Sequence, residues 1–312
     1  MAKKESYKNG LIELFRFLCS LWVAYFHGFS PILSDKFNGE NISTDFFFML
    51  SGFFFLKSIE KYIEKPFRTG VSFIILGRTK RFIVPLIIAA ASILFCNIVF
   101  ELDFGGFNWP LSFLWFFAAQ FILLPLFYLL LKKLKKPYSF NIVCVAIICF
   151  CLSLVMLDLK QFDRVVRSPA MLALGMLISQ IPKINIKFKN ESSGRKITLL
   201  VNTVCFVISS ATFIYLAYLP GQAIWKRHLL LCVVCPAVLY FANALPVRSK
   251  IMNFLGELST FIYLAQCPIL IHHYAVSRDT RDQFPLFCIC IVAMLVINRI
   301  INKIASKKKI AT

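Results

Sequence analysis

The sequence predicts an all-α membrane protein, a polytopic transmembrane helical bundle of about ten spans with both termini in the cytoplasm. Three observations support this prediction. The 312-residue chain is 59% hydrophobic with a mean hydropathy of +0.73. Apolar runs approaching or reaching the roughly 17–25 residues that cross a bilayer as a helix recur along its length. Its basic residues gather in every second connection between these runs.

The apolar runs follow one another with only short connections between them. We therefore expect residues 1–312 to form a single membrane-embedded domain, with no folded domain outside the membrane. The second and sixth runs are short, while the others are long enough to cross the bilayer. In chain order the predicted spans are 11–29, 43–57, 73–100, 110–131, 139–157, 168–181, 197–219, 228–246, 254–275 and 284–303.

The distribution of charge predicts the orientation of these spans. With the N-terminus inside, the inner segments hold 26 of the 35 lysines and arginines, and the outer loops hold eight. This asymmetry obeys the positive-inside rule across an even number of spans, which places both termini in the cytoplasm. The net charge of +20 is then explained by membrane topology, so we expect the lipid bilayer, and no nucleic acid, as a partner.

The first predicted span carries two residues that a bilayer interior disfavours, Arg16 and His27. Eleven helical steps of 100° make three turns plus about 20°, so both lie on one face about 16 Å apart. Ionisable residues within a span are candidates for function by default. The alternative is that the two side chains extend to opposite membrane interfaces.

The second predicted span opens with Asp45 and continues through Ser51 and Gly52. We expect Asp45 near the level of His27, where its carboxylate would accept an N–H from the imidazole and orient it, as in base–orienter pairs. The alternative is that Asp45 caps the N-terminus of its helix. Gly52 permits a close backbone approach, which suits either helix packing or a narrow ligand path.

A basic cluster, Arg78, Lys80 and Arg81, precedes most of the third span. Arginine guanidinium groups at the membrane interface are suited to phosphate recognition, because they form bidentate contacts. The alternative is anchoring of the span by the positive-inside rule, which explains many such clusters. In the ninth span, Glu257 and Gln266 are polar groups that need partners inside a bilayer. We expect no metal site, because no second pair or nearby histidine completes the one Cys-x-x-Cys pair.

Taken in order along the chain, these residues resemble the acyltransferase-3 family of integral membrane O-acyltransferases, from residue 10 to about 270. The family's first-helix signature, an arginine and a histidine with ten residues between them, is matched by Arg16 and His27. In the ninth span Gln266 stands where the family pattern has a histidine. The matches in the second to fourth spans are Asp45, Phe47, Phe48, Ser51, Gly52, Phe53, Arg78, Arg81, Pro85, residues 114–117 and residues 125–126.

The resemblance implies transfer of an acyl group, most often acetyl, from cytoplasmic acyl-CoA to a hydroxyl of a cell-surface or lipid-linked glycan on the outer face of the inner (cytoplasmic) membrane. Within it, His27, Arg16 and Asp45 are the expected catalytic residues. The residues expected to bind the donor are Arg78, Lys80, Arg81, Ser51 and Gly52. Two alternatives are a multi-span transporter and a non-catalytic partner in glycan export or assembly, which the loss of the ninth-span histidine keeps open.

Overall fold

The structure is a computed structural model that describes residues 9–28, 39–99, 108–134, 136–156, 163–184, 191–218, 224–275, 285 and 287–300. Within some helices only the backbone is described, and this applies to three of the predicted site residues, His27, Lys80 and Arg81. Every regular element of the described residues is helical. The predicted all-α fold is therefore confirmed.

Each predicted apolar run corresponds to a helix, and most helices begin a few residues before the apolar run. Polar residues at the ends extend the helices because their backbone hydrogen bonds continue past the apolar stretch. A short 3₁₀ turn, η1 (Glu60–Tyr62), follows α2, and a last apolar helical stretch covers Phe287–Ile300. The α-helices are α1 (Gly10–Gly28), α2 (Gly39–Ile59), α3 (Phe67–Val99), α4 (Asn108–Leu134), α5 (Pro137–Met156), α6 (Asp163–Gln180), α7 (Glu191–Ala217), α8 (Ile224–Ala244) and α9 (Lys250–Ala275).

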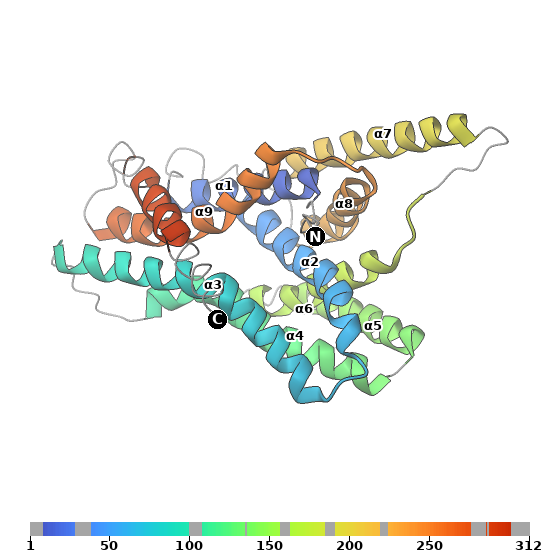
Figure 1. The fold of residues 1–312 in the computed structure, drawn as a ribbon, viewed down its shortest axis with the longest axis horizontal. Coiled ribbons are helices and arrows are strands. Elements are labelled where there is room, and N and C mark those ends of the chain that lie inside the picture. The colour runs from blue at the N-terminus through green and yellow to red at the C-terminus, as the bar shows by residue number, and fades with distance from the viewer. Residues whose placement is uncertain are drawn as a thin grey trace, which may run out of the picture.

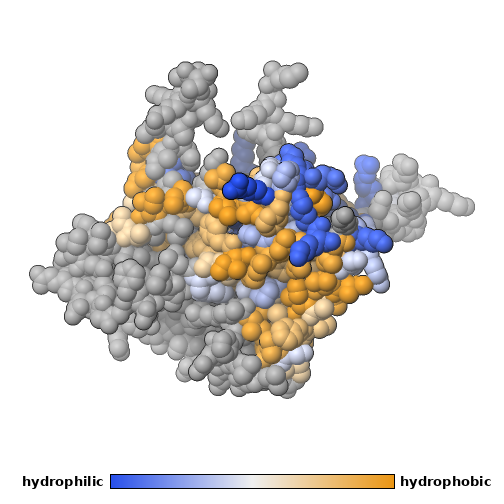
Figure 2. All heavy atoms as spheres, turned by 90° about the horizontal axis from the view of Figure 1, so that it is seen from below, coloured by the Kyte–Doolittle hydropathy of each residue, from blue (hydrophilic) through white to orange (hydrophobic). Residues whose placement is uncertain are grey.

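Several of these helices are suited to cross a membrane. Among the described residues, four helical stretches are long and apolar enough by length and composition, at Ile42–Tyr62, Trp115–Leu134, Pro137–Met156 and Ser193–Ala217. Large hydrophobic side chains are exposed along α5 and α7, where a soluble protein would place polar groups. In Figure 2 apolar residues cover much of the described surface, and hydrophilic residues gather toward one edge. The chain is a multi-pass membrane protein.

The two helix pairs with the most extensive contacts are distant in sequence (Figure 1). The most extensive contacts join α1 to α9 and α2 to α6, while α5 also packs on α6 and α7 on α8. The first and ninth helices therefore lie side by side although more than 200 residues separate them. This pairing brings the polar residues of the first span onto those of the ninth.

A close backbone approach joins α2 to α6. A Cβ atom at Gly52 would collide with the backbone of Leu172, and one at Gly175 would collide with the backbone of Met49. Such small residues at facing positions let two membrane helices pack at short distance. Of the two roles considered for Gly52, the structure shows helix packing.

The start of α1 is anchored by Asn9. Its Oδ1 atom accepts the backbone N–H of Leu11 at 3.0 Å, which caps the helix, and its Nδ2 donates to the carbonyls of Ala242 and Leu245, both at 2.8 Å. The backbone N–H of Gly10 also donates to Val247 O at 2.9 Å. These bonds tie α1 to the segment between α8 and α9 and so set the register of α1 along α9.

Candidate active site

A cavity of about 840 Å³ lies between α1, α2, α3, α4, the end of α8, α9 and the Phe287–Ile300 helix. Three of the residues predicted for the site line it, namely Arg16, Ser51 and Arg78. The structure therefore brings a predicted catalytic residue and two predicted donor-binding residues to one cavity. Gly52 does not line it, because consecutive helical residues point about 100° apart and Gly52 faces α6 instead.

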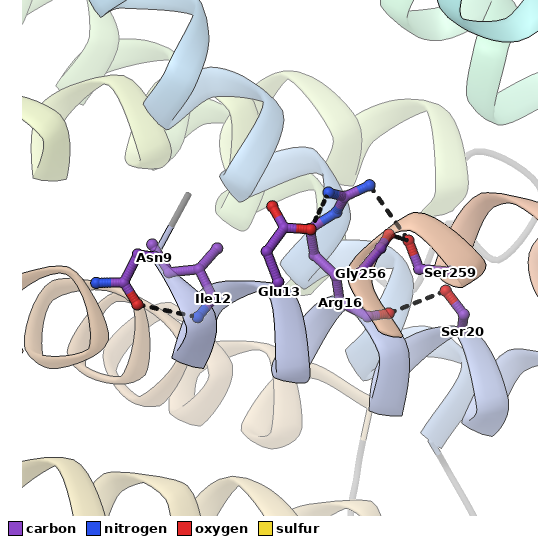
Figure 3. Close-up of polar contacts among 7 residues, drawn as sticks. All are labelled: Asn9, Ile12, Glu13, Arg16, Ser20, Gly256 and Ser259. Atoms are coloured by element: carbon purple, nitrogen blue, oxygen red, sulfur yellow. Dashed lines mark hydrogen bonds and ion pairs between the residues drawn. The ribbon is translucent and has the colours of Figure 1, made fainter. Parts of the chain in front are cut away.

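The Arg16 side chain is buried and held from two sides (Figure 3). Its Nη1 forms an ion pair with Glu13 Oε2 at 2.6 Å, one helical turn earlier on α1. Its Nη2 donates to Ser259 Oγ of α9 at 3.2 Å, and the same hydroxyl donates to Gly256 O at 2.7 Å. The guanidinium therefore lies in a fixed orientation at the α1–α9 contact, with its charge compensated by Glu13.

Space for the Glu13 carboxylate depends on Gly256. A Cβ atom at this position would collide with Glu13 Oε2 and approach Glu13 Cβ and Cδ. Any larger residue would therefore displace the carboxylate that orients Arg16. This explains why a glycine stands in α9 opposite the ion pair.

The second arginine of the cavity, Arg78, comes from α3. Its Nη1 donates to Gln120 Oε1 of α4 at 2.7 Å, and the Gln120 side chain is buried. Among the described residues no carboxylate forms an ion pair with Arg78. Arg16 and Arg78 therefore lie in different electrostatic environments, one beside a carboxylate and one beside a neutral amide.

Aromatic rings form one wall of the cavity. Phe47 of α2, Phe116 and Phe117 of α4 and Tyr263 of α9 all line it. Their ring centroids lie 5.7 Å apart for Phe116 and Tyr263, and 5.9 Å for Phe117 and Tyr263. At these distances the rings make favourable edge and tilted contacts. The cavity thus combines arginine side chains with an aromatic wall.

Asp45 lies outside the cavity and forms a buried ion pair. Its Oδ2 accepts from Arg167 Nη1 of α6 at 3.3 Å, and the two side chains are 1% and 3% exposed. Arg167 precedes the predicted sixth span, 168–181, but lies within a helix, because α6 begins at Asp163. The capping interpretation of Asp45 was wrong, since α2 begins six residues earlier, at Gly39.

The backbone of His27 lies near the end of α1, and its side chain is outside the described residues. The rings of Phe15 and Phe46 are 6.0 Å apart, which places Asp45 near the level of the Arg16 turn. His27 is twelve residues beyond Phe15, about 18 Å further along the helix. Asp45 was expected near the level of His27, but it lies near the level of the Arg16 turn. The reason is that α2 begins early, which places Asp45 nearly two turns into its helix.

Lys80 and Arg81 are in α3 with Arg78, and their side chains lie outside the described residues. Sequence reasoning missed four partners of the predicted residues: Glu13, Gln120, Arg167 and Ser259. Two of them carried a recognisable signal. Glu13 stands three residues before Arg16, the spacing of helical ion pairs, and Gln120 is an amide inside an apolar run that needs a partner.

The comparisons with known proteins agree with the resemblance in the sequence. Residues 9–302 match the Acyl_transf_3 acyltransferase domain. The chain belongs to this family and is a membrane acyltransferase. No curated protein and no solved structure matches it.

Proposed function

We propose that this enzyme transfers an acyl group, usually acetyl, from coenzyme A to a hydroxyl of a cell-surface or lipid-linked glycan across the inner (cytoplasmic) membrane. The observation that carries the proposal is the cavity that joins Arg16, Ser51 and Arg78 to an aromatic wall. Family membership supports an enzyme over a transporter or an assembly partner.

The cavity has the features that a thioester donor of this kind requires. Coenzyme A carries phosphates at one end and a long, largely uncharged arm that ends in the thioester. Arg78, supported by Lys80 and Arg81 of the same helix, would bind the phosphates, because guanidinium groups form strong bonds to phosphate oxygens. The aromatic wall would contact the arm, and Arg16 would bind a phosphate or an amide oxygen of the arm.

His27 is the residue we assign to the chemical step. As a general base it would take the proton of the acceptor hydroxyl while the oxygen attacks the thioester carbonyl carbon. The carbon–sulfur bond then breaks, and the thiolate takes the proton from the imidazolium. As an acyl carrier its imidazole would instead attack the thioester carbonyl carbon, lose its ring proton to the departing thiolate and so release coenzyme A as the thiol; in a second step the hydroxyl oxygen would take the acyl group and the imidazole would regain a proton from the hydroxyl. Asp45 would support the site from α2 through its ion pair with Arg167.

The transfer assay tests the function directly. Purified protein in vesicles, supplied with radiolabelled acetyl-CoA on the side of its termini, is expected to place label on a membrane glycan. A preparation that binds and turns over no acetyl-CoA, with or without membrane glycan, would contradict the proposal.

The proposed topology places both termini and residues 58–72, 132–138 and 182–196 in the cytoplasm, where their lysines and arginines obey the positive-inside rule. Single cysteines on a cysteine-free background are expected to resist an impermeant thiol reagent at position 189 and to react at position 36 in intact cells. Reaction at position 189 from outside would refute this orientation.

The basic cluster is expected to serve the donor. Replacing Arg78 and Arg81 together with glutamine should weaken acetyl-CoA binding by about tenfold or more and reduce its dependence on salt, because each guanidinium supplies charge-assisted bonds. Titration calorimetry in detergent would measure both effects. Arg68→Gln, an exposed change at the start of the same helix, is the control. Unchanged affinity in the double variant would leave the cluster as a topological anchor.

A further inference from the structure

The contact between Arg78 and Gln120 joins two helices at the wall of the cavity. The residues are 42 positions apart, on α3 and α4, and the hydrogen bond between them is 2.7 Å long. Gln120 is only 2% exposed, so its amide has little freedom to turn elsewhere. The bond therefore holds the Arg78 guanidinium in one orientation beside the cavity.

The partner of Arg78 differs in charge from the partner of Arg16. Glu13 compensates the charge of Arg16 at 2.6 Å, whereas the Gln120 amide is neutral and leaves the charge of Arg78 in place. The other ionised groups that line the cavity are Glu257 and Arg299, and neither forms an ion pair with Arg78 within the described part of the chain. Within the part of the chain that the structure describes, Arg78 is thus a fixed cation at the cavity wall without a carboxylate partner.

We propose that Gln120 is a positioning residue, which orients Arg78 to bind a phosphate group while preserving its positive charge. A carboxylate at this position would hold the guanidinium equally well but would cancel the charge that attracts the anion. One N–H of the arginine is used by Gln120, and its remaining donors can serve the ligand. The inference rests on the proposed function insofar as the phosphate belongs to the acyl donor.

The test replaces Gln120 with glutamate, which keeps the size of the side chain and introduces the compensating charge. Binding to purified full-length protein is measured with three probes: coenzyme A, inorganic pyrophosphate, and S-acetylpantetheine, which carries the thioester arm without nucleotide phosphates. We expect Gln120→Glu to weaken binding of coenzyme A and pyrophosphate about 10-fold or more, the loss of one charge-assisted contact. Its affinity for S-acetylpantetheine should stay unchanged.

Two further variants separate positioning from a general effect of charge or folding. In an Arg78→Gln background, Gln120→Glu should cause no additional loss of coenzyme A affinity, because its effect acts through Arg78. Asn243→Asp makes the same amide-to-acid change elsewhere in the cavity and should cause a much smaller loss. Thermal unfolding in detergent reports whether each variant is folded, and Gln120→Asn, a shorter amide, should retain part of the affinity.

The outcomes distinguish this inference from the proposed function. Three results would overturn the positioning role alone. They are an equal loss of affinity for all three probes, an equal effect of Gln120→Glu in the wild-type and Arg78→Gln backgrounds, or unchanged binding in Gln120→Glu. Binding of pyrophosphate that depends on Gln120, without any binding of coenzyme A, would support the phosphate site and refute the donor. Competition by phosphatidic acid in mixed micelles, lost in Gln120→Glu, would then identify a lipid headgroup as the source of the phosphate.

Discussion

Replacing His27 with glutamine is expected to lower acyl transfer by about 10²–10⁴-fold, the usual contribution of general acid–base catalysis. Glutamine keeps a hydrogen-bonding side chain but cannot exchange a proton at neutral pH or carry an acyl group as imidazole does. The variant should still insert into the membrane and bind acetyl-CoA, because the cavity residues Arg16 and Arg78 are unchanged. The measurement is transfer of label to glycan at equal protein level, with donor affinity determined in parallel.

A matched control is His228→Gln, which replaces a histidine of α8, about 200 residues after His27 in the chain. It should retain transfer. If His27→Gln also retained near-full transfer, His27 would have no part in the chemistry. If instead an acyl group became covalently attached to the wild-type protein and not to His27→Gln, the carrier role would be preferred over the base role.

The second large effect concerns stability and the buried pair of Asp45 and Arg167. Arg167→Met is expected to lower the free energy of unfolding by about 3–5 kcal/mol, because it removes the guanidinium that pairs with a carboxylate only 1% exposed. Replacing both residues together, with Asp45→Leu and Arg167→Met, should recover most of this loss, since no unbalanced charge then remains. Thermal unfolding in detergent would measure the three variants.

The double variant also separates two roles for Asp45. If it is stable but fails in transfer, Asp45 contributes to the reaction; if it is stable and active, the pair serves packing of α2 on α6. The exposed Arg68→Met is the control and should change stability by less than about 0.5 kcal/mol. A single Arg167→Met variant as stable as the wild type would show that the ion pair contributes little.

The helices could be predicted from the sequence because a membrane span is a local property. An apolar run of sufficient length must form a helix in a bilayer, where every backbone polar group needs a partner within its own segment. For the same reason Arg16 and Arg78 could be selected as candidates from their cost in apolar surroundings. The structure placed both of them on one cavity.

The partners of these residues could not be predicted in the same way. Arg16 bonds to Ser259, 243 residues later, and Arg78 bonds to Gln120, 42 residues later. Both contacts depend on which helices pack together and in which register. The predicted level of Asp45 was wrong for this reason. The start of α2 at Gly39 determines which turn of α1 lies beside Asp45.

The sequence by itself determined the all-α class, the order of the helices and the acyltransferase family of this protein. Only the tertiary structure decided that α1 lies along α9, that Gly52 faces α6, and that, among the described residues, Arg16 pairs with a carboxylate while Arg78 bonds to a neutral amide. The physical reason is range: length and hydropathy act within a single helix, whereas side-chain pairing depends on contacts between helices that are remote in the chain.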